Sequence, residues 1–201
     1  MVNRRTVRPN VSALTILIPT TGRREEMLRI VTCAYVAQHP DAEILTCEGF
    51  SWGYGLNELA PKASGEYLLC GCDDTLPHAG WFEAGRAMLD AGQEPASRYF
   101  RQDGAPLHDR DVQAHGTAVG WCRSFLLTPA IFREVGPFID ATWYADGDYS
   151  ERLETAGWPI VAGDGFAWTH LDGERDWQTE ERGAYELERY MDSHRARGIG
   201  V

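Results

Sequence analysis

Apolar runs and amphipathic stretches alternate along the first half of the chain. Runs typical of buried strands lie at 14–19 (LTILIP), at 42–49 (AEILTCEG) and from 67 onward (YLLCGC). Helices are predicted between and after these runs, over 23–38, within 53–65 and over 80–91. One face of the first helix carries the apolar side chains of Met27, Ile30, Val31 and Ala34. This order of strand and helix predicts a parallel sheet with right-handed crossovers.

The second half of the chain is less regular. Strands are predicted over 96–100 and 120–128, with one or two more within 158–170, and a long polar loop follows the first of them. A short helix begins at Pro129 and stops at Gly136, and a longer one runs from near 146 to 157. The tail from 177 to about 197 is predicted to be a helix with one packing side, formed by Leu187, Tyr190, Met191 and His194.

Composition points to one globular domain. The chain has 201 residues, of which 43% are hydrophobic, which is enough for a substantial core. We predict a flexible basic arm over 1–12, a single domain over 13–175, and a helical tail over 176–201 that packs on that domain. No apolar stretch is long enough to cross a bilayer. Five Cys residues without a C-x-x-C pair favour a reducing, cytoplasmic setting.

Charge narrows the range of partners. The formal net charge is −11, and so acidic a surface repels the phosphate backbone, which disfavours nucleic acid as the main partner. A smaller phosphate-bearing substrate would need a metal ion or a local Arg to offset the same repulsion.

Two adjacent carboxylates end the third apolar run. Residues 67–77 read YLLCGCDDTLP, and Pro77 is expected to stop the strand. Asp73 and Asp74 would then stand at the carboxyl end of a central strand, where open α/β sheets bind their ligands. Two carboxylates there can hold a divalent cation, and with it a phosphate group. A plain Asp-rich turn is the alternative interpretation.

The order of these segments resembles that of family 2 glycosyltransferases. The resemblance covers roughly residues 14–172 and is carried by LTILIPT, by GYGLNELAPKASGEYLLCGCDDTLPHAGWFEAG, by FREVGPFIDATWYADGDYSERLETAGWPIV and by a late His. It implies a single GT-A-type, Rossmann-like α/β domain with a mostly parallel central sheet flanked by helices. It also implies a nucleotide-sugar donor, such as a UDP-, GDP- or dTDP-sugar.

The resemblance assigns donor-binding positions. The first strand and its turn would border the nucleotide through Pro19, Thr20, Thr21 and Gly22. Glu48 would contact the base or ribose, with a solvated turn residue as the alternative. Asn57 would take a polar helix position of the family, or would serve as a helix cap. Asp73 would face the ribose or the donor sugar.

A metal site is implied by the same resemblance. The D-x-D region of the family corresponds to Cys72-Asp73-Asp74, in which Cys replaces the first carboxylate. Asp74 is the residue expected to bind Mn²⁺ or Mg²⁺. His170 would lie near the diphosphate and complete the metal site, with a structural role as the alternative. Cys72 is better explained as a small buried thiol than as a ligand for a soft metal.

An inverting sugar transfer also needs a general base for the acceptor hydroxyl. The family places this base in an acidic motif at a helix start, which matches Ala145-Asp146-Gly147-Asp148 here and assigns the role to Asp146. Helix capping is the alternative for Asp146. Acceptor contacts are expected from Trp143, Tyr144 and Asp148. The two aromatic residues could instead belong to the core, and Asp148 could pair with Arg152.

These features predict an inverting, metal-dependent glycosyltransferase that moves one sugar to a hydroxyl of a glycan, a protein or a small molecule. The loop at 101–119 and the C-terminal helix would shape the acceptor site. A pyrophosphorylase-like nucleotidyltransferase is one alternative, but such enzymes have a Gly-rich loop where this chain reads PTTGRRE. The other alternative is a non-catalytic nucleotide- or carbohydrate-binding module, which would explain the missing acids at Cys72 and Ala145.

Overall fold

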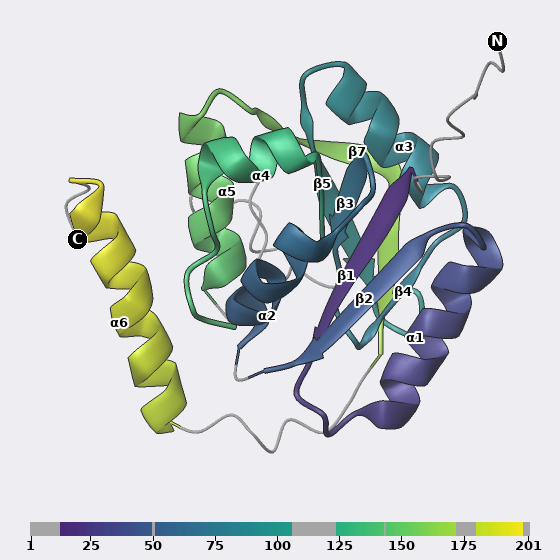
Figure 1. The fold of residues 1–201 in the computed structure, drawn as a ribbon, viewed down its shortest axis with the longest axis horizontal. Coiled ribbons are helices and arrows are strands. Elements are labelled where there is room, and N and C mark those ends of the chain that lie inside the picture. Colours follow the sequence, from purple (N-terminus) through teal and green to yellow (C-terminus); the bar gives the residue numbers. More distant parts are fainter. Residues whose placement is uncertain (1–12, 50, 106–123, 143, 172–179, 199–201) are drawn as a thin grey trace, which may run out of the picture.

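The described part of the chain folds into two β-sheets surrounded by helices (Figure 1). This computed structural model describes residues 13–49, 51–105, 124–142, 144–171 and 180–198. The predicted arm at 1–12, Trp143 and most of the predicted loop at 101–119 lie outside these ranges.

The first sheet holds the buried apolar strands of the N-terminal half. Its strands, in spatial order, are β2 (Glu43–Glu48), β1 (Leu14–Thr20), β3 (Tyr67–Cys70) and β6 (Phe125–Leu127). β1 is parallel to both β2 and β3, whereas β6 is antiparallel to β3. The first six residues of β1 are buried, as expected for a central strand with both faces covered.

A second sheet, which was not predicted from the sequence, lies beside the first. Its order is β4 (Thr75–Pro77), β7 (Ile160–His170) and β5 (Glu94–Phe100), with β7 antiparallel to β4 and parallel to β5. The third strand of the first sheet ends at Cys70, so Pro77 does not stop it. Pro77 instead pairs with Trp168 in the edge strand β4, where a residue without an N–H is tolerated. Asp73 and Asp74 therefore lie in the turn between the two sheets.

Within the described ranges, six α-helices connect and cover the sheets. They are α1 (Glu25–Gln38), α2 (Trp52–Leu59), α3 (Trp81–Asp90), α4 (Pro129–Val135), α5 (Ala145–Thr155) and α6 (Glu180–Ala196), with the short 3₁₀ helix η1 (Ala60–Lys62) after α2. Local signals set several ends. The Ser51 side chain caps α2, the Thr128 side chain caps α4, and Gly136 with φ +88° ends α4. The predicted start and stop of α4 are confirmed.

The buried face of α1 differs from the predicted one. Val31 and Tyr35 are fully buried, whereas Ile30 is 40% exposed. The Tyr35 hydroxyl accepts a hydrogen bond from Trp168 Nε1 at 2.9 Å, which ties α1 to β7. A Tyr can face the core when its hydroxyl finds a partner there, and apolar periodicity alone does not reveal that partner.

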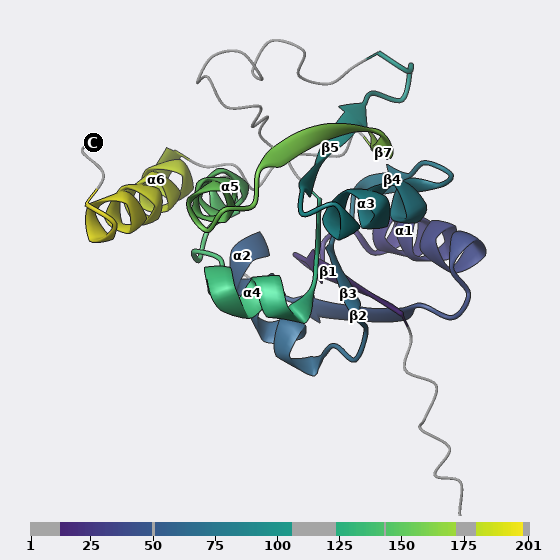
Figure 2. The same ribbon diagram turned by 90° about the horizontal axis from the view of Figure 1, so that it is seen from above.

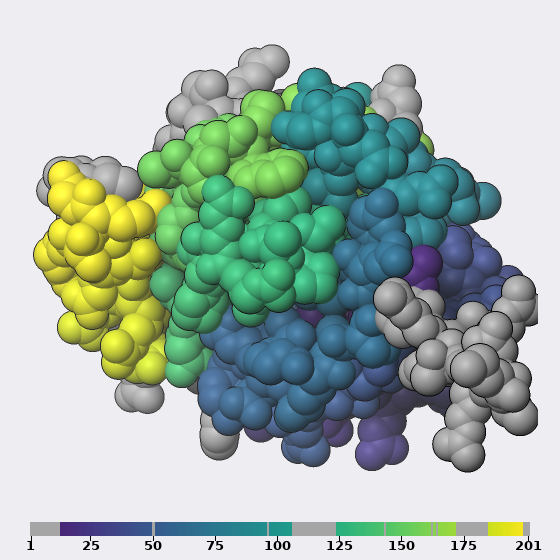
Figure 3. All heavy atoms as spheres, turned by 45° about the horizontal axis from the view of Figure 1, so that its top comes forward, coloured from purple at the N-terminus to yellow at the C-terminus, as the bar shows by residue number. Residues whose placement is uncertain are grey.

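The last helix, α6, lies beside α5 at one edge of the molecule, as Figures 1 and 2 both show. In the space-filling view it forms that whole edge (Figure 3). The predicted packing side is right for Tyr190 and His194, which contact Glu151 of α5, and wrong for Leu187, which is 43% exposed. Glu186 is buried as well. α6 therefore turns a largely polar face toward α5. No helix within the described ranges has the length and apolar character that a membrane span requires.

One carboxylate joins three segments at the far end of the first sheet. Glu43 Oε2 accepts hydrogen bonds from Thr15 Oγ1 (2.7 Å), Ser64 N (2.8 Å) and Ser64 Oγ (3.0 Å). Desolvation alone would raise the pKa of Glu43, but these hydrogen bonds outweigh it and lower the pKa below its usual value of 4.5.

We expect Glu43→Gln to lower the free energy of unfolding by about 1 kcal/mol at pH 7, because charge-assisted hydrogen bonds become neutral ones. A lowered carboxylate pKa gives stability that is present above the unfolded value and lost as pH falls through the folded value. The difference in the free energy of unfolding between native protein and variant should therefore disappear in acid. Urea unfolding between pH 7 and pH 3 measures it. Glu66→Gln, at an exposed neighbouring position, is the control, and a difference that persists in acid would contradict the assignment.

Candidate active site

The Asp73–Asp74 pair lies beside the carboxyl end of β1. In the parallel register Leu17 of β1 pairs with Cys70 of β3, so Thr20 and Asp73 each stand three residues beyond that pair. The Thr20 hydroxyl makes a hydrogen bond to the Asp73 carboxylate. The structure thus brings together two of the predicted donor-site residues, at the sheet edge where the sequence placed them.

A guanidinium group lies between the two carboxylates. Arg24, the residue before α1, places Nη1 at 2.5 Å from Asp74 Oδ2 and at 3.3 Å from Asp73 Oδ1. Burial alone would lower the pKa of Arg24, but Asp74 and Asp73 outweigh it and raise the pKa, so the group stays charged. Arg24 was not among the predicted site residues. One signal was available, because a phosphate-bearing substrate of so acidic a chain would need a metal ion or a local Arg, and Arg24 lies just after the first strand.

Asp73 is the more buried member of the pair, with 7% of its surface exposed. Its Oδ1 contacts Arg24, while its buried Oδ2 has no hydrogen-bond partner among the described residues. Desolvation and the neighbouring charge of Asp74 raise the pKa of Asp73, against the opposing effects of Thr20 and Arg24. A buried carboxylate with an unpartnered oxygen is costly, and such groups occur at sites that accept a further ligand.

His170 joins this group from the second sheet. It is the last residue of β7 and pairs with Thr75 of β4. Its Nε2 lies 3.6 Å from Asp74 Oδ2, and the backbone N–H of Leu171 donates to Asp74 O at 2.7 Å. The end of β7 therefore holds His170 beside Asp74, as the resemblance implied.

Glu48 and the turn after β1 complete this edge. Glu48 pairs with Thr20 across the β1–β2 register. Gly22 has φ +74°, a conformation that favours glycine, and it lies against the Glu48 carboxylate, since a Cβ there would lie 2.5 Å from Glu48 Oε1. Thr21 has a buried hydroxyl without a hydrogen bond in the described part of the chain. Pro19 packs against α2, where a Cβ on Gly55 would lie 2.5 Å from Pro19 Cβ.

Asn57 has an internal role that the sequence did not predict. Its Nδ2 donates to Phe138 O and its Oδ1 accepts from Phe138 N, both at 2.9 Å. The alternative that Asn57 caps its helix is wrong, because Ser51 caps α2. Both ends of the amide are occupied by backbone, so Asn57 fixes the segment after α4 to α2, and its donor contact stays a prediction.

Trp52 connects the two halves of the candidate site and was also missed. Its Nε1 donates to Gly71 O at 2.8 Å, next to the Asp pair, and its backbone N–H donates to Thr142 Oγ1 at 3.2 Å, next to α5. Trp52 thus connects the β3–β4 turn to the segment that precedes Asp146. No pattern along the chain distinguishes this Trp from one that only fills the core.

Asp146 lies in the first turn of α5 with 4% of its surface exposed. Its Oδ1 accepts from the backbone N–H of Gly147 at 2.9 Å. This contact is the local hydrogen bonding expected of an Asp at a helix start. It is compatible with a base as well, because a carboxylate has further acceptor positions.

Asp148 contributes to the packing of α6 on α5. It has no exposed surface, its Oδ2 accepts from Arg152 Nε at 2.9 Å, and its Oδ1 accepts from Arg197 Nη2 at 3.1 Å and from Ser193 Oγ. The Arg152 alternative is therefore confirmed. Because these partners and α6 cover the carboxylate, they oppose an acceptor contact by Asp148, which stays a prediction.

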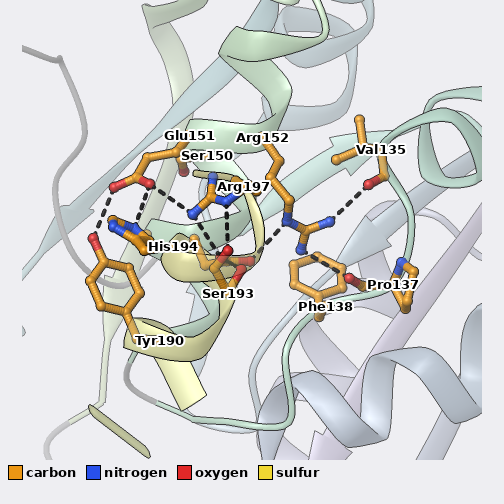
Figure 4. Close-up of polar contacts among 12 residues, drawn as sticks. Val135, Pro137, Phe138, Ser150, Glu151, Arg152, Tyr190, Ser193, His194 and Arg197 are labelled. Carbon is orange, nitrogen blue, oxygen red and sulfur yellow. Dashed lines mark hydrogen bonds and ion pairs between the residues drawn. The ribbon is translucent and has the colours of Figure 1, made fainter. Parts of the chain in front are cut away.

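Further polar contacts extend this interface (Figure 4). Glu151 is reached from α6 by Tyr190 Oη at 2.8 Å, His194 Nε2 at 2.8 Å and Arg197 Nη2 at 3.1 Å. The ring of Tyr144 lies 5.3 Å from that of Tyr190. Tyr144 is half-buried and packs against Tyr190 of α6, outside the hydrophobic core, and its acceptor contact stays a prediction. Trp143 lies outside the described residues.

The side chains around Asp74 fit a divalent ion only in part. Among the residues that the structure describes, no group of three or more His, Cys, Asp and Glu side chains is arranged to hold a metal. Asp74 and His170 nevertheless offer an oxygen and a nitrogen, donors that suit Mn²⁺. The unpartnered oxygen of Asp73 adds local negative charge. The set fits an ion that takes its remaining ligands from phosphate and water, as Mg²⁺ sites commonly do.

Comparison with known proteins establishes the fold. No protein-family model and no curated sequence matches the chain. Among solved structures, it is similar to the mannosyltransferase PcManGT from Pyrobaculum calidifontis in complex with GDP-Man and Mn²⁺, with a TM-score of 0.64 at 13% identity. It is also similar to GalNAc-T7 with UDP, GalNAc and Mn²⁺, with a TM-score of 0.60 at 10% identity. These likenesses cover 94% of this chain but only 65% and 48% of the other two. The chain therefore has the α/β fold, with a mixed and mainly parallel sheet, of GT-A glycosyltransferases.

Proposed function

We propose that the protein is an inverting glycosyltransferase that transfers one sugar from a nucleotide-sugar to an acceptor hydroxyl. The observation that carries the proposal is the convergence of Thr20, Glu48, Asp73, Asp74 and His170 at one sheet edge. Two proteins of the same fold hold a sugar nucleotide or its parts together with Mn²⁺.

Each residue of the group has a distinct role in this proposal. Glu48 and the turn at Gly22 border the nucleoside, and Asp73 faces the ribose or the donor sugar. Asp74 and His170 would hold a divalent ion, which when bound supplies positive charge to the diphosphate leaving group. Asp146 removes the proton from the acceptor hydroxyl as the new glycosidic bond forms and the bond to the diphosphate breaks.

A binding experiment tests the donor half of this proposal. Calorimetry with UDP-, GDP- and dTDP-sugars should identify a donor that binds in the presence of Mn²⁺. For that donor, Asp74→Asn should weaken binding by about 10–100-fold, the usual cost of disturbing a metal site. Asp41→Asn, which makes the same charge change at an exposed position, should leave the affinity unchanged.

Two outcomes would count against the proposal. Equal affinity of native protein and Asp74→Asn, with and without Mn²⁺, would exclude the metal role of Asp74. Donor binding without hydrolysis or transfer to any acceptor would instead favour a non-catalytic binding module.

A further inference from the structure

We propose that Arg24 is the resident cation of the Asp73–Asp74 pair and competes with a divalent ion for the same carboxylate oxygens. The inference rests on the proposed function only in treating the pair as a cation site. It predicts that the guanidinium must leave before a metal ion can bind.

Arg24 places one guanidinium nitrogen between the two carboxylates. That nitrogen, Nη1, contacts oxygens of both Asp residues, at 2.5 Å and 3.3 Å. Arg–carboxylate pairs are frequently bidentate, whereas Arg24 divides its contacts between two carboxylates. A positive group in this place occupies the position that a divalent ion would take.

His170 lies near the same Asp74 oxygen that Arg24 contacts. Asp74 Oδ2 accepts from Arg24 and lies 3.6 Å from His170 Nε2. An ion held by Asp74 and His170 would meet the guanidinium at this oxygen. Two cations at such close range repel each other strongly in a partly buried site, so their simultaneous binding is disfavoured.

The site retains capacity for a further ligand while Arg24 is bound. Asp73 is 7% exposed, and its Oδ2 remains without a hydrogen-bond partner among the described residues. A purely structural ion pair would be expected to satisfy this buried oxygen. The guanidinium therefore neutralises the charge of the pair without using all of its oxygens.

Arg24 can leave without any change in the fold. Its backbone is fixed, because Arg24 O accepts from Leu28 N at 2.9 Å and begins α1. The side chain is reached by solvent, with 15% of its surface exposed. Its long, flexible stem allows the guanidinium to swing away by rotation about side-chain bonds alone.

Mn²⁺ binding to the free protein tests the competition directly. Free Mn²⁺ is measured by electron paramagnetic resonance in titrations of native protein, Arg24→Gln, Arg24→Lys and Arg29→Gln. We expect Arg24→Gln to bind Mn²⁺ about tenfold more tightly than native protein, because the competing charge is gone. Arg29→Gln removes a positive charge from an exposed position of the same helix and should change the affinity by less than about twofold, because that charge is screened. Arg24→Lys, which keeps the charge, should stay near native.

A second readout covers the case in which Arg24→Gln folds poorly. In native protein, diamagnetic Mg²⁺ should shift the NMR signal of the Arg24 guanidinium toward that of a solvent-exposed Arg. The same addition should have no effect in Asp74→Asn, where the ion has lost its ligand. An unmoved Arg24 signal at saturating Mg²⁺ would show that the ion and the guanidinium bind together and would overturn the proposal.

The remaining outcomes separate this proposal from the proposed function. Equal or weaker Mn²⁺ binding by Arg24→Gln, or no Mn²⁺ binding by any of the four proteins, would overturn the competition while leaving sugar transfer open. Tighter binding by Arg24→Gln in a protein that never transfers sugar would support the competition and contradict the proposed function.

Discussion

Replacing Asp146 with Asn is expected to reduce sugar transfer by about 10²–10⁴-fold, the usual contribution of a general base. Asn keeps the side-chain oxygen that accepts from the Gly147 N–H, so the start of α5 should be preserved. It cannot take a proton from the acceptor hydroxyl. Turnover is measured with a saturating donor, and donor affinity is measured in parallel by calorimetry.

Donor affinity distinguishes a general base from a residue with only a structural role at position 146. It should change by less than about twofold in Asp146→Asn, because a group that acts only in the transition state contributes little to ground-state binding. Asp41→Asn serves as the charge-matched control. Native-like turnover of the Asp146 variant would remove this residue from the mechanism and leave helix capping as its role.

Replacing Asp148 with Ala is expected to cause the largest loss of stability, about 3–5 kcal/mol, because it leaves buried charges without their partner. The carboxylate has no exposed surface and lies between Arg152 on its own helix and Arg197 on α6. For a domain of this size such a loss corresponds to a decrease in Tm of about 6–20 °C. Thermal and urea unfolding both measure it.

Two further variants show which contacts of Asp148 cause the loss of stability. Arg197→Ala removes the contacts of Arg197 with Asp148 and Glu151. It should cost less than Asp148→Ala, because the contacts of Asp148 with Arg152 and Ser193 survive. Asp192→Ala removes an exposed carboxylate of α6 that pairs with Arg195 and should change stability by less than about 0.5 kcal/mol. A Tm of Asp148→Ala within a few degrees of native would mean that the buried pair contributes no net stability.

The sequence predicted the elements of the fold better than their arrangement. Apolar runs and helix signals located every strand of the first sheet and helices α1 to α6 near their observed positions. The split into two sheets was missed, because the chain leaves the first sheet at Cys70 and re-enters regular structure at Thr75 within a few residues. A run such as YLLCGCDDTLP gives no local sign that its two ends belong to different sheets.

Side-chain partners explain the errors at helix faces. Tyr35 faces the core because Trp168 donates to its hydroxyl. The polar side of α6 faces inward because Asp148 and Glu151 of α5 provide hydrogen-bond partners for it. In both cases a partner distant in sequence decides which face is buried. Periodicity of apolar residues cannot report such a pairing.

The candidate site was predictable where residues follow strand ends. Thr20, Glu48, Asp73 and His170 each lie at or just beyond the end of a strand, and the order of strands brings them together. Arg24 and Trp52 were missed because they act across the fold, through contacts with residues 49 and 19 positions away. Asp148 was assigned to the acceptor because nothing in the sequence indicates that α6 covers it.

The polar face of α6 makes the attachment of this helix responsive to dissolved ions. Its contacts to Asp148 and Glu151 are made by Arg197, His194, Ser193 and Tyr190. Salt screens the contacts of Glu151, whose side chain is 34% exposed, more than it screens the buried contacts of Asp148. Raising the ionic strength should therefore weaken the attachment of α6 to α5 while the two sheets remain intact.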